Sequence, residues 1–167
     1  MLLTISTAHQ PTSDLGFLLH KHTDKVQTFK VSGGEVQVFY PEFSLKKATI
    51  AMLLELDSID LVRKMKVPNG SLALHHYVND RPYVASSFAS SAIANILGSA
   101  MNGNCKNRPE LLGIKMNFEV QIEVLKVRGN PLLIDNIFEP LGYEVSYQRH
   151  SLDEAFPDCG ERPFYSL

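Results

Sequence analysis

Short runs in which apolar residues alternate with polar ones, or stand together, dominate the first third of the chain. Alternation with a period of two is typical of a half-buried β-strand, and a short apolar run is typical of a buried one. Two of the runs flank Ser32, Gly33 and Gly34, and paired glycines tolerate the positive φ of a tight hairpin turn. We therefore expect strands at residues 2–7, 26–31, 35–40 and 50–56. The second and third of these are expected to form a hairpin.

Helical spacing replaces this alternation in other segments. A first helix is expected after Ser13 and Asp14, whose side-chain oxygens suit a helix N-terminus. One face of this helix carries Leu15, Leu18, Leu19 and His22. A longer helix begins at Pro82 and is stopped by Asn102 and Gly103. Its many alanine and serine residues allow close approach of other backbones, so we expect it to lie buried against a sheet.

Two further helices and three further strands are expected, apart from the strand at residues 116–124 that is described next. A short helix is expected at residues 57–65, with Asp57 as its N-cap, and another follows Asn130 and is ended by Pro140 and Gly142. The additional strands are expected at residues 72–78, 143–147 and 164–167.

Residues 116–124 show the clearest strand pattern in the chain. The apolar positions are Met116, Phe118, Val120, Ile122 and Val124, and every residue between them is polar. We therefore expect one face of this strand in the core and the other in solvent. Because strands and helices interleave irregularly, the sequence predicts an α+β fold with a mixed, mainly antiparallel sheet packed with several helices.

The composition is that of an ordinary soluble globular protein, since 44% of the 167 residues are hydrophobic and 20% are charged. A net charge of −2 provides no overall electrostatic footprint for nucleic acid, which needs clustered lysine and arginine. We expect a single domain over residues 1–167. We also expect it to be truncated at its C-terminal end, because the chain stops in a strand-like run.

The N-terminal residues lack the basic and apolar regions of a signal peptide. The longest uninterrupted apolar run, residues 50–54, is far too short to span a bilayer. Cys105 and Cys159 follow no metal-binding or redox spacing, so we interpret them as reduced thiols. These observations predict a cytoplasmic protein with no membrane partner.

Several catalytic motifs are missing from the sequence. The only paired glycines, Gly33 and Gly34, lie between two expected strands, whereas the cofactor turn of a Rossmann-type methyltransferase joins a strand to a helix. The sequence also has no Walker A motif, no Lys-x-Asp-Gly motif of nucleotidyl-transferring ligases and no His-Glu-x-x-His zinc motif. We therefore expect no catalytic residue, metal site or cofactor site in this chain.

The histidines and cysteines leave two minor alternatives open. His20 and His22 would point about 200° apart on a helix, away from a common metal ion. A metal site that folding assembles from His9 and His20 stays open, and so does a nucleophilic pair of Cys105 with a histidine. We favour capping and hydrogen-bonding roles, because no carboxylate or thiolate is spaced to complete such a site.

A dense polar and aromatic cluster lies where the strand expected at 72–78 meets the long helix. It consists of Asn79, Asp80, Arg81, Pro82 and Tyr83. Loops at such junctions often carry function, and tyrosine and arginine are frequent at binding hot spots. A helix cap with a salt bridge explains the same residues equally well. We predict a partner-binding surface at Asn79, Asp80, Arg81 and Tyr83.

Four segments, in the same order along nearly the whole chain, resemble one known protein family. Residues 8–22, AHQPTSDLGFLLHKH, are similar to the opening of the bacterial HEN-type RNA 3′-terminal ribose 2′-O-methyltransferases. The other similar segments are residues 37–41, 77–88 and 138–145. Each segment is weak by itself, but their common order argues against chance.

The resemblance implies that this chain is a non-catalytic N-terminal region. In that family the N-terminal half associates with the RNA ligase of a polynucleotide kinase-phosphatase–ligase machine, which mends RNAs cut by ribotoxins, and is implied to switch on ligase adenylylation. The methyltransferase core, which uses S-adenosylmethionine and a divalent metal, lies in the C-terminal half. The resemblance therefore assigns no catalytic residue to this chain, and RNA is a partner only within the full complex.

Three hypotheses of function follow from these observations. The first is a module that docks on a repair ligase and stabilises its active conformation. The second is an RNA-binding domain that delivers RNA 3′ ends to the methyltransferase, with a basic patch at Lys46, Lys47 and residues 63–66. The third, an independent hydrolase using histidine and cysteine, has the least support from the spacing of those residues.

Overall fold

The computed structural model of the chain describes residues 1–57, 82–127, 129–151 and 161–167, with the backbone alone at 82–87 and 161–163. These residues form two compact units, Met1–Val120 and Gln121–Leu167. Each unit has its own buried residues, and the expectation of a single domain stays a prediction. The strand expected at 72–78, and the helix at 57–65 apart from Asp57 itself, lie outside the described residues.

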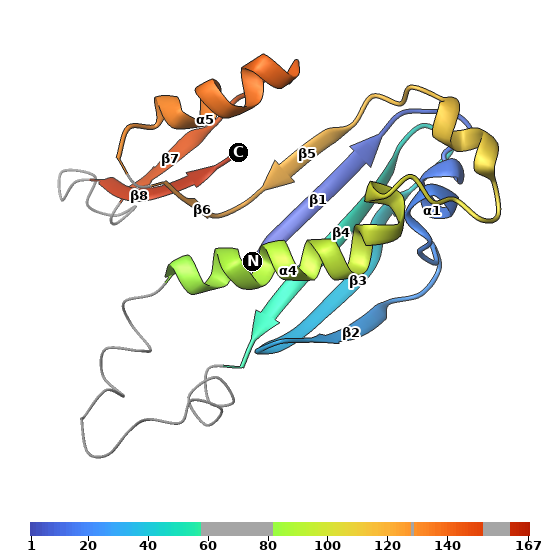
Figure 1. Cartoon of the computed structure of the whole chain (residues 1–167), viewed down its shortest axis with the longest axis horizontal. Helices are drawn as coiled ribbons and strands as arrows, with labels where there is room; N and C mark the ends of the chain where they lie inside the picture. Colours follow the sequence, from blue (N-terminus) through green and yellow to red (C-terminus); the bar gives the residue numbers. More distant parts are fainter. Residues whose placement is uncertain (58–81, 128, 152–160) are drawn as a thin grey trace. The chain divides into compact units, whose positions relative to one another are not determined.

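A five-stranded sheet organises the first unit, and its last strand along the chain ends at Ile122, just past the boundary at Val120 (Figure 1). Its strands are β1 (Leu2–Thr7), β2 (Gln27–Val31), β3 (Gly34–Phe43), β4 (Ala48–Leu56) and β5 (Glu119–Ile122). They follow the order β2-β3-β4-β1-β5, and the pairs β1–β4, β2–β3 and β3–β4 are antiparallel. The four strands expected in the first third of the chain are therefore confirmed.

The two glycines of the expected hairpin have different physical roles. Val31 pairs with Gly34, so Ser32 and Gly33 form the loop, and Gly33 adopts a φ of 80°, which favours glycine. A Cβ atom on Gly34 would collide with the backbone carbonyl of Glu55 on β4. Gly33 therefore permits the turn, whereas Gly34 permits the close approach of two strands.

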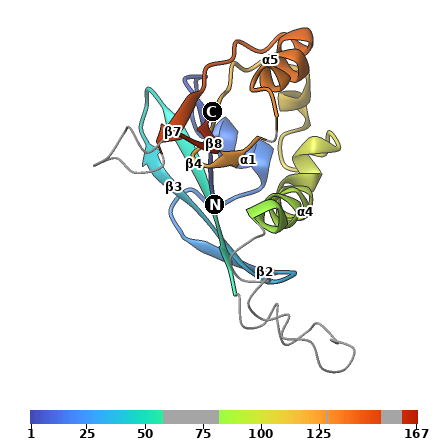
Figure 2. The same ribbon diagram turned by 90° about the vertical axis from the view of Figure 1, so that its left-hand side faces the viewer.

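Two α-helices, α1 (Asp14–Leu19) and α4 (Pro82–Met101), lie on the same side of this sheet (Figure 2). Helix α1 ends earlier than expected, because His20 takes the left-handed conformation with a φ of 54°. Leu15 and Leu19 are buried, but His22 lies exposed beyond the helix end. The prediction that His22 belongs to the apolar helical face is therefore wrong.

The long helix α4 begins at Pro82 and stops before Asn102 and Gly103, as expected, and Gly103 has a φ of 67°. The helix contacts β4 of the sheet. Its buried residues, among those whose side chains are described, are Ala89, Ala92, Ile96 and Leu97. Its opposite face, which includes Ala94 and Asn95, is exposed. The small residues therefore bring one face of α4 against the sheet. A short 3-10 helix, η1 (Pro109–Gly113), follows α4 along the chain.

The strand expected at 116–124 is shorter than predicted, and its predicted core face is wrong. Strand β5 covers only Glu119–Ile122, and Phe118, Val120 and Val124 are 45–50% exposed. Strand β5 stands at one end of the strand order, next to β1. An alternating pattern shows that a strand has two different faces, but it does not show that another layer covers the apolar one.

The second unit combines a three-stranded sheet with one α-helix. Its sheet contains β6 (Leu125–Lys126), β7 (Gln148–Ser151) and β8 (Glu161–Ser166) in the order β6-β8-β7, with both pairs antiparallel. The side-chain oxygen of Asn130 accepts a hydrogen bond from the Leu132 N–H at 3.0 Å at the start of α5 (Leu132–Phe138), as expected. Val127, Ile134 and Tyr165 form the buried core.

The strand expected at 143–147 is wrong, because β7 begins only at Gln148. The preceding segment attaches to α5 and its extension, the 3-10 helix η2 (Glu139–Leu141). The Tyr143 N–H donates to the Phe138 carbonyl, and the two rings meet edge to face at 5.9 Å. The Tyr147 hydroxyl donates to Asp135 at 3.0 Å. These contacts hold the alternating tyrosines against the helix instead of in the sheet.

The described elements confirm the predicted α+β class with a mainly antiparallel sheet. The strand expected at 164–167 is also confirmed within β8. In the part of the chain that the structure describes, no helix is long and apolar enough to cross a membrane.

Candidate functional site

The partner-binding residues expected from the sequence lie at the margin of the described structure. Asn79, Asp80 and Arg81 fall outside the described residues. Tyr83 lies in the first turn of α4, where only the backbone is described. The binding surface expected at these positions therefore stays a prediction.

A cleft of about 450 Å³ opens beside α1 in the first unit. Its walls come from α1, from the segment that follows α1 and from the end of β3, and they include Ser13, Phe17, His20, Lys21, His22 and Phe43. Phe17 is 41% exposed and Phe43 is 45% exposed. The volume lies within the usual range of small-molecule sites, so the cleft is the first candidate for a binding site.

The wall behind the cleft is tightly packed. A Cβ atom on Gly16 would lie 3.0 Å from the Thr23 methyl group and 3.8 Å from the Tyr40 hydroxyl oxygen. Burial raises the pKa of Tyr40, and its hydroxyl has no hydrogen-bond partner among the described residues. A buried polar group without a partner costs roughly 1–3 kcal/mol, so this wall keeps unused hydrogen-bonding capacity.

Three consecutive residues with basic side chains, His20, Lys21 and His22, line the cleft. Lys21 is half-buried, and burial lowers its pKa. Its ammonium lies 5.1 Å from the centroid of the Phe29 ring, and no carboxylate among the described residues forms an ion pair with it. His20 Nε2 donates a hydrogen bond to the Asn104 carbonyl at 2.9 Å, because a carbonyl can only accept.

Next to the cleft, the buried carboxylate of Asp14 ties α1 to the segment before η1. Arg108 Nη1 lies 2.5 Å from Asp14 Oδ1, and His9 Nε2 lies 3.7 Å from Oδ2. Arg108 Nε also donates to Glu110 at 2.8 Å, which raises the pKa of Arg108 and lowers that of Glu110. The Arg108 guanidinium lies 5.7 Å from the centroid of the Phe17 ring. This ion-pair group therefore holds one wall of the cleft.

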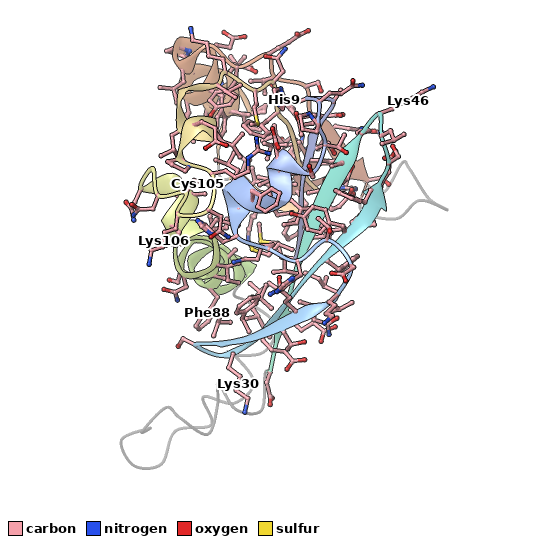
Figure 3. All side chains as sticks on the ribbon, turned by 90° about the vertical axis from the view of Figure 1, so that its right-hand side faces the viewer. His9, Lys30, Lys46, Phe88, Cys105 and Lys106 are labelled. Atoms are coloured by element: carbon pink, nitrogen blue, oxygen red, sulfur yellow. The ribbon has the colours of Figure 1, made fainter. Side chains whose placement is uncertain are left out.

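Metal and thiol chemistry find little support in the described residues. No group of three or more histidine, cysteine, aspartate or glutamate side chains there could hold a metal ion. Cys105 is a free, buried cysteine whose Sγ lies 3.5 Å from the Phe17 carbonyl oxygen (Figure 3). This burial argues against Cys105 as a nucleophile, because an attacking thiolate needs access to its substrate. Cys159 lies outside the described residues.

A serine and a histidine in the second unit contact each other, but the direction of their hydrogen bonds does not suit catalysis. Ser166 Oγ and His150 Nε2 lie 2.9 Å apart, but Ser166 Oγ also donates to the Glu123 carbonyl at 2.7 Å. The hydroxyl proton therefore points at a carbonyl, and His150 donates to the serine. A general base would have to accept that proton, so this arrangement does not activate Ser166.

A sequence model of the family described as the RNA repair, ligase-Pnkp-associating, region of Hen1 matches residues 1–167. The chain belongs to this family. No curated protein matches the sequence. The family match covers the whole chain and confirms the resemblance found from its segments, so this region of Hen1 associates with the ligase and Pnkp in RNA repair.

One segment that carried the resemblance lines the cleft of this Hen1 region, and a second ends two residues before Phe43 of the cleft. Residues 8–22 provide the α1 wall, and residues 37–41 include Tyr40 and lead directly to Phe43. Sequence reasoning missed this site, because it weighed His20 and His22 as metal ligands or as capping and hydrogen-bonding residues, and not as part of a ligand site. The available signal was the run of three basic side chains directly after a helix.

Exposed apolar residues mark two further surfaces. In the first unit they lie along and beside β5, at Phe118 and Val120. In the second unit they lie on α5 and the residues that follow it. These are Leu132, Leu133, Ile137, Leu141 and Tyr143, which are 48–69% exposed. Clusters of exposed apolar side chains are typical of protein-interaction surfaces.

The basic patch expected for RNA is weakened in the structure. Lys47 Nζ lies 3.2 Å from Glu119 Oε2, so it has an acidic neighbour. Lys46 is exposed and points away from the sheet (Figure 3). Residues 63–66 lie outside the described residues. The described residues therefore favour protein association over a broad RNA-binding surface.

Proposed function

We propose that this Hen1 region is a non-catalytic module that binds the RNA ligase of a bacterial polynucleotide kinase-phosphatase–ligase complex and promotes ligase adenylylation. The match of the whole chain to a ligase-Pnkp-associating family carries the proposal. The parent protein is then a cytoplasmic RNA 3′-terminal 2′-O-methyltransferase. Its S-adenosylmethionine and divalent metal belong to a C-terminal domain, and this chain needs neither.

Activation requires that docking distinguish two states of the ligase. A bound protein shifts an equilibrium only through its difference in affinity for the two states. A tenfold shift corresponds to about 1.4 kcal/mol, which the burial of a single large apolar side chain supplies. The half-exposed apolar residues of β5 and α5 offer several such side chains. The module therefore has enough unburied apolar surface to act in this way.

The docking energy is proposed to centre on Asn79, Asp80, Arg81 and Tyr83. Arginine and tyrosine are common binding hot spots, and Tyr83 lies in the first turn of α4. Asp80 is expected to help start the helix, so Arg81 and Tyr83 are the cleaner probes. The polar face of the strand expected at 116–124, with Glu119, Gln121 and Glu123, is the next candidate, and Glu119 and Gln121 are exposed.

The test measures transfer of labelled adenylate from ATP to the cognate ligase, with and without the chain. We expect the chain to raise the yield of enzyme-adenylate and to co-purify with the ligase. Equal yields in both reactions would contradict activation, and loss of co-purification would contradict association. An RNA-delivery module would instead bind RNA in a strongly salt-dependent manner without changing adenylylation.

Alanine variants of the two probes locate the docking surface. Arg81→Ala and Tyr83→Ala should each weaken ligase binding by roughly thirtyfold, since truncating a hot spot typically costs about 2 kcal/mol. Melting temperature is measured beside affinity, so that a structural role of Tyr83 is recognised. Lys106→Ala is the control, because Lys106 is exposed beyond α4 (Figure 3). Unchanged affinity in both variants would move the docking surface to β5.

A further inference from the structure

The cleft beside α1 has a chemistry that protein docking alone does not use. Phe17 and Phe43 expose two aromatic rings within a concavity of about 450 Å³. An exposed ring in a concave site offers a stacking platform, because every nucleobase has a flat face that fits one. The cleft is therefore shaped for a flat aromatic group.

The basic and polar residues that line the cleft favour a ligand that also carries negative charge. Its lining residues, all of them described, include the basic side chains of His20, Lys21 and His22 and no carboxylate. The nearby carboxylate of Asp14 is buried and already paired with Arg108. An anion beside Lys21 would therefore meet an ammonium that no carboxylate of the described residues pairs with, and burial partly desolvates that ammonium, which strengthens the attraction.

Neutral hydrogen-bond donors surround the same basic group. Ser13 precedes α1 without making a side-chain capping bond, and Thr23 and Asn107 also line the cleft. Hydroxyl and amide groups commonly complete the contacts to a phosphate or a ribose. The cleft thus combines an aromatic platform, a cationic centre and neutral donors in one place.

We propose that this cleft binds a nucleoside monophosphate unit, with the base stacked on Phe17 or Phe43 and the phosphate held by Lys21 and His22. The unit is either a free nucleotide or the phosphorylated end of an RNA strand, since both present the same chemistry. The proposal does not rest on ligase docking, and binding needs neither the ligase nor a methyltransferase domain.

The direct test is calorimetric titration of the whole chain with AMP, adenosine and inorganic phosphate. AMP should bind at one site, and adenosine and phosphate should each bind at least about tenfold more weakly, because each lacks one half of the recognition. Added salt should weaken the binding of AMP. A short 5′-phosphorylated RNA and its unphosphorylated counterpart distinguish a strand end from a free nucleotide.

Variants place the binding in the cleft. Lys21→Met and Phe43→Ala should each weaken AMP binding by about tenfold or more. Lys30→Met removes the same charge from an exposed position on β2 and should leave binding unchanged (Figure 3). Phe43 is half exposed, so its truncation leaves the core intact, and melting temperature verifies this for both variants.

Two results would overturn the proposal. One is the absence of saturable binding of AMP and of the phosphorylated RNA up to about 10 mM, a range in which even very weak sites respond. The other is binding that Lys21→Met and Phe43→Ala leave intact, because the ligand would then sit elsewhere. Neither result bears on ligase adenylylation, so the nucleotide site and the proposed activation fail independently.

Discussion

Among single side chains, the buried carboxylate of Asp14 makes the most concentrated set of polar contacts around the cleft. It is only 2% exposed, and it joins α1 to Arg108 and to His9. A buried charge is tolerated only when it is paired and hydrogen-bonded. We therefore expect Asp14 to hold Phe17 in place in the wall of the cleft rather than to take part in a reaction.

Asp14→Asn is expected to lower the free energy of unfolding by about 2 kcal/mol. The substitution keeps the shape of the side chain but removes a charge-assisted hydrogen bond of the kind worth about 1.5–3 kcal/mol. Urea denaturation followed by circular dichroism measures the change. Asp24→Asn is the matched control at an exposed position and should stay within about 0.5 kcal/mol of the parent. Equal urea midpoints for the two variants would show that the contact between Asp14 and Arg108 contributes little to stability.

At the scale of elements, the hairpin of β2 and β3 contains two adjacent glycines that are needed for different physical reasons. Gly33 is needed for the backbone conformation of the turn, because its φ of 80° is costly for other residues. Gly34 is needed because there is no room for a side chain: the backbone of β4 occupies the place of a Cβ atom. The sequence pattern indicated the turn, but only the neighbouring strand explains the second glycine.

Gly34→Ala should therefore destabilise the sheet by about 2–3 kcal/mol, because the added methyl group meets backbone that cannot rotate away. Gly98→Ala is the control within α4. Its added methyl group meets nothing within 4 Å, and alanine favours a helix by up to about 1 kcal/mol. Thermal unfolding should show a lower melting temperature for the first variant and an equal or higher one for the second. The reverse order would mean that β3 and β4 are not in close contact at Gly34.

Across the whole molecule, the two compact units bury unequal cores. The first unit buries residues from β1, β3, β4, α1 and α4, whereas the second buries Val127, Ile134 and Tyr165. A small core supports little independent stability, because burial grows with the size of the unit. The second unit should therefore open before the first.

Ile134→Ala should increase hydrogen exchange in the second unit while β1 and β4 keep their protection. The side chain is 3% exposed, and losing a buried isoleucine typically costs roughly 2–5 kcal/mol. Ile137→Ala removes the same side chain from a half-exposed position on α5 and should have a much smaller effect. A parallel loss of protection in β1 and β4 would show that both units unfold together.

Much of the candidate site lay beyond sequence reasoning. The capping of α5 by Asn130 and the stop of α4 at Gly103 follow from local chemistry, so the pattern predicted them correctly. The cleft instead joins the end of α1 to Phe43 at the end of β3. Such a pairing depends on strand order and register, which no local spacing encodes.

The sequence by itself determined the period of most of the described elements and therefore the α+β class, because alternation and helical spacing follow from local backbone geometry. It also excluded familiar catalytic motifs. Only the tertiary structure decided what covers each face. Strand β5 leaves Phe118 and Val120 half exposed, and the segment around Tyr147 attaches to α5 instead of pairing in a sheet. The reason is that burial depends on which neighbours other parts of the chain provide, and a periodic pattern contains no information about those neighbours.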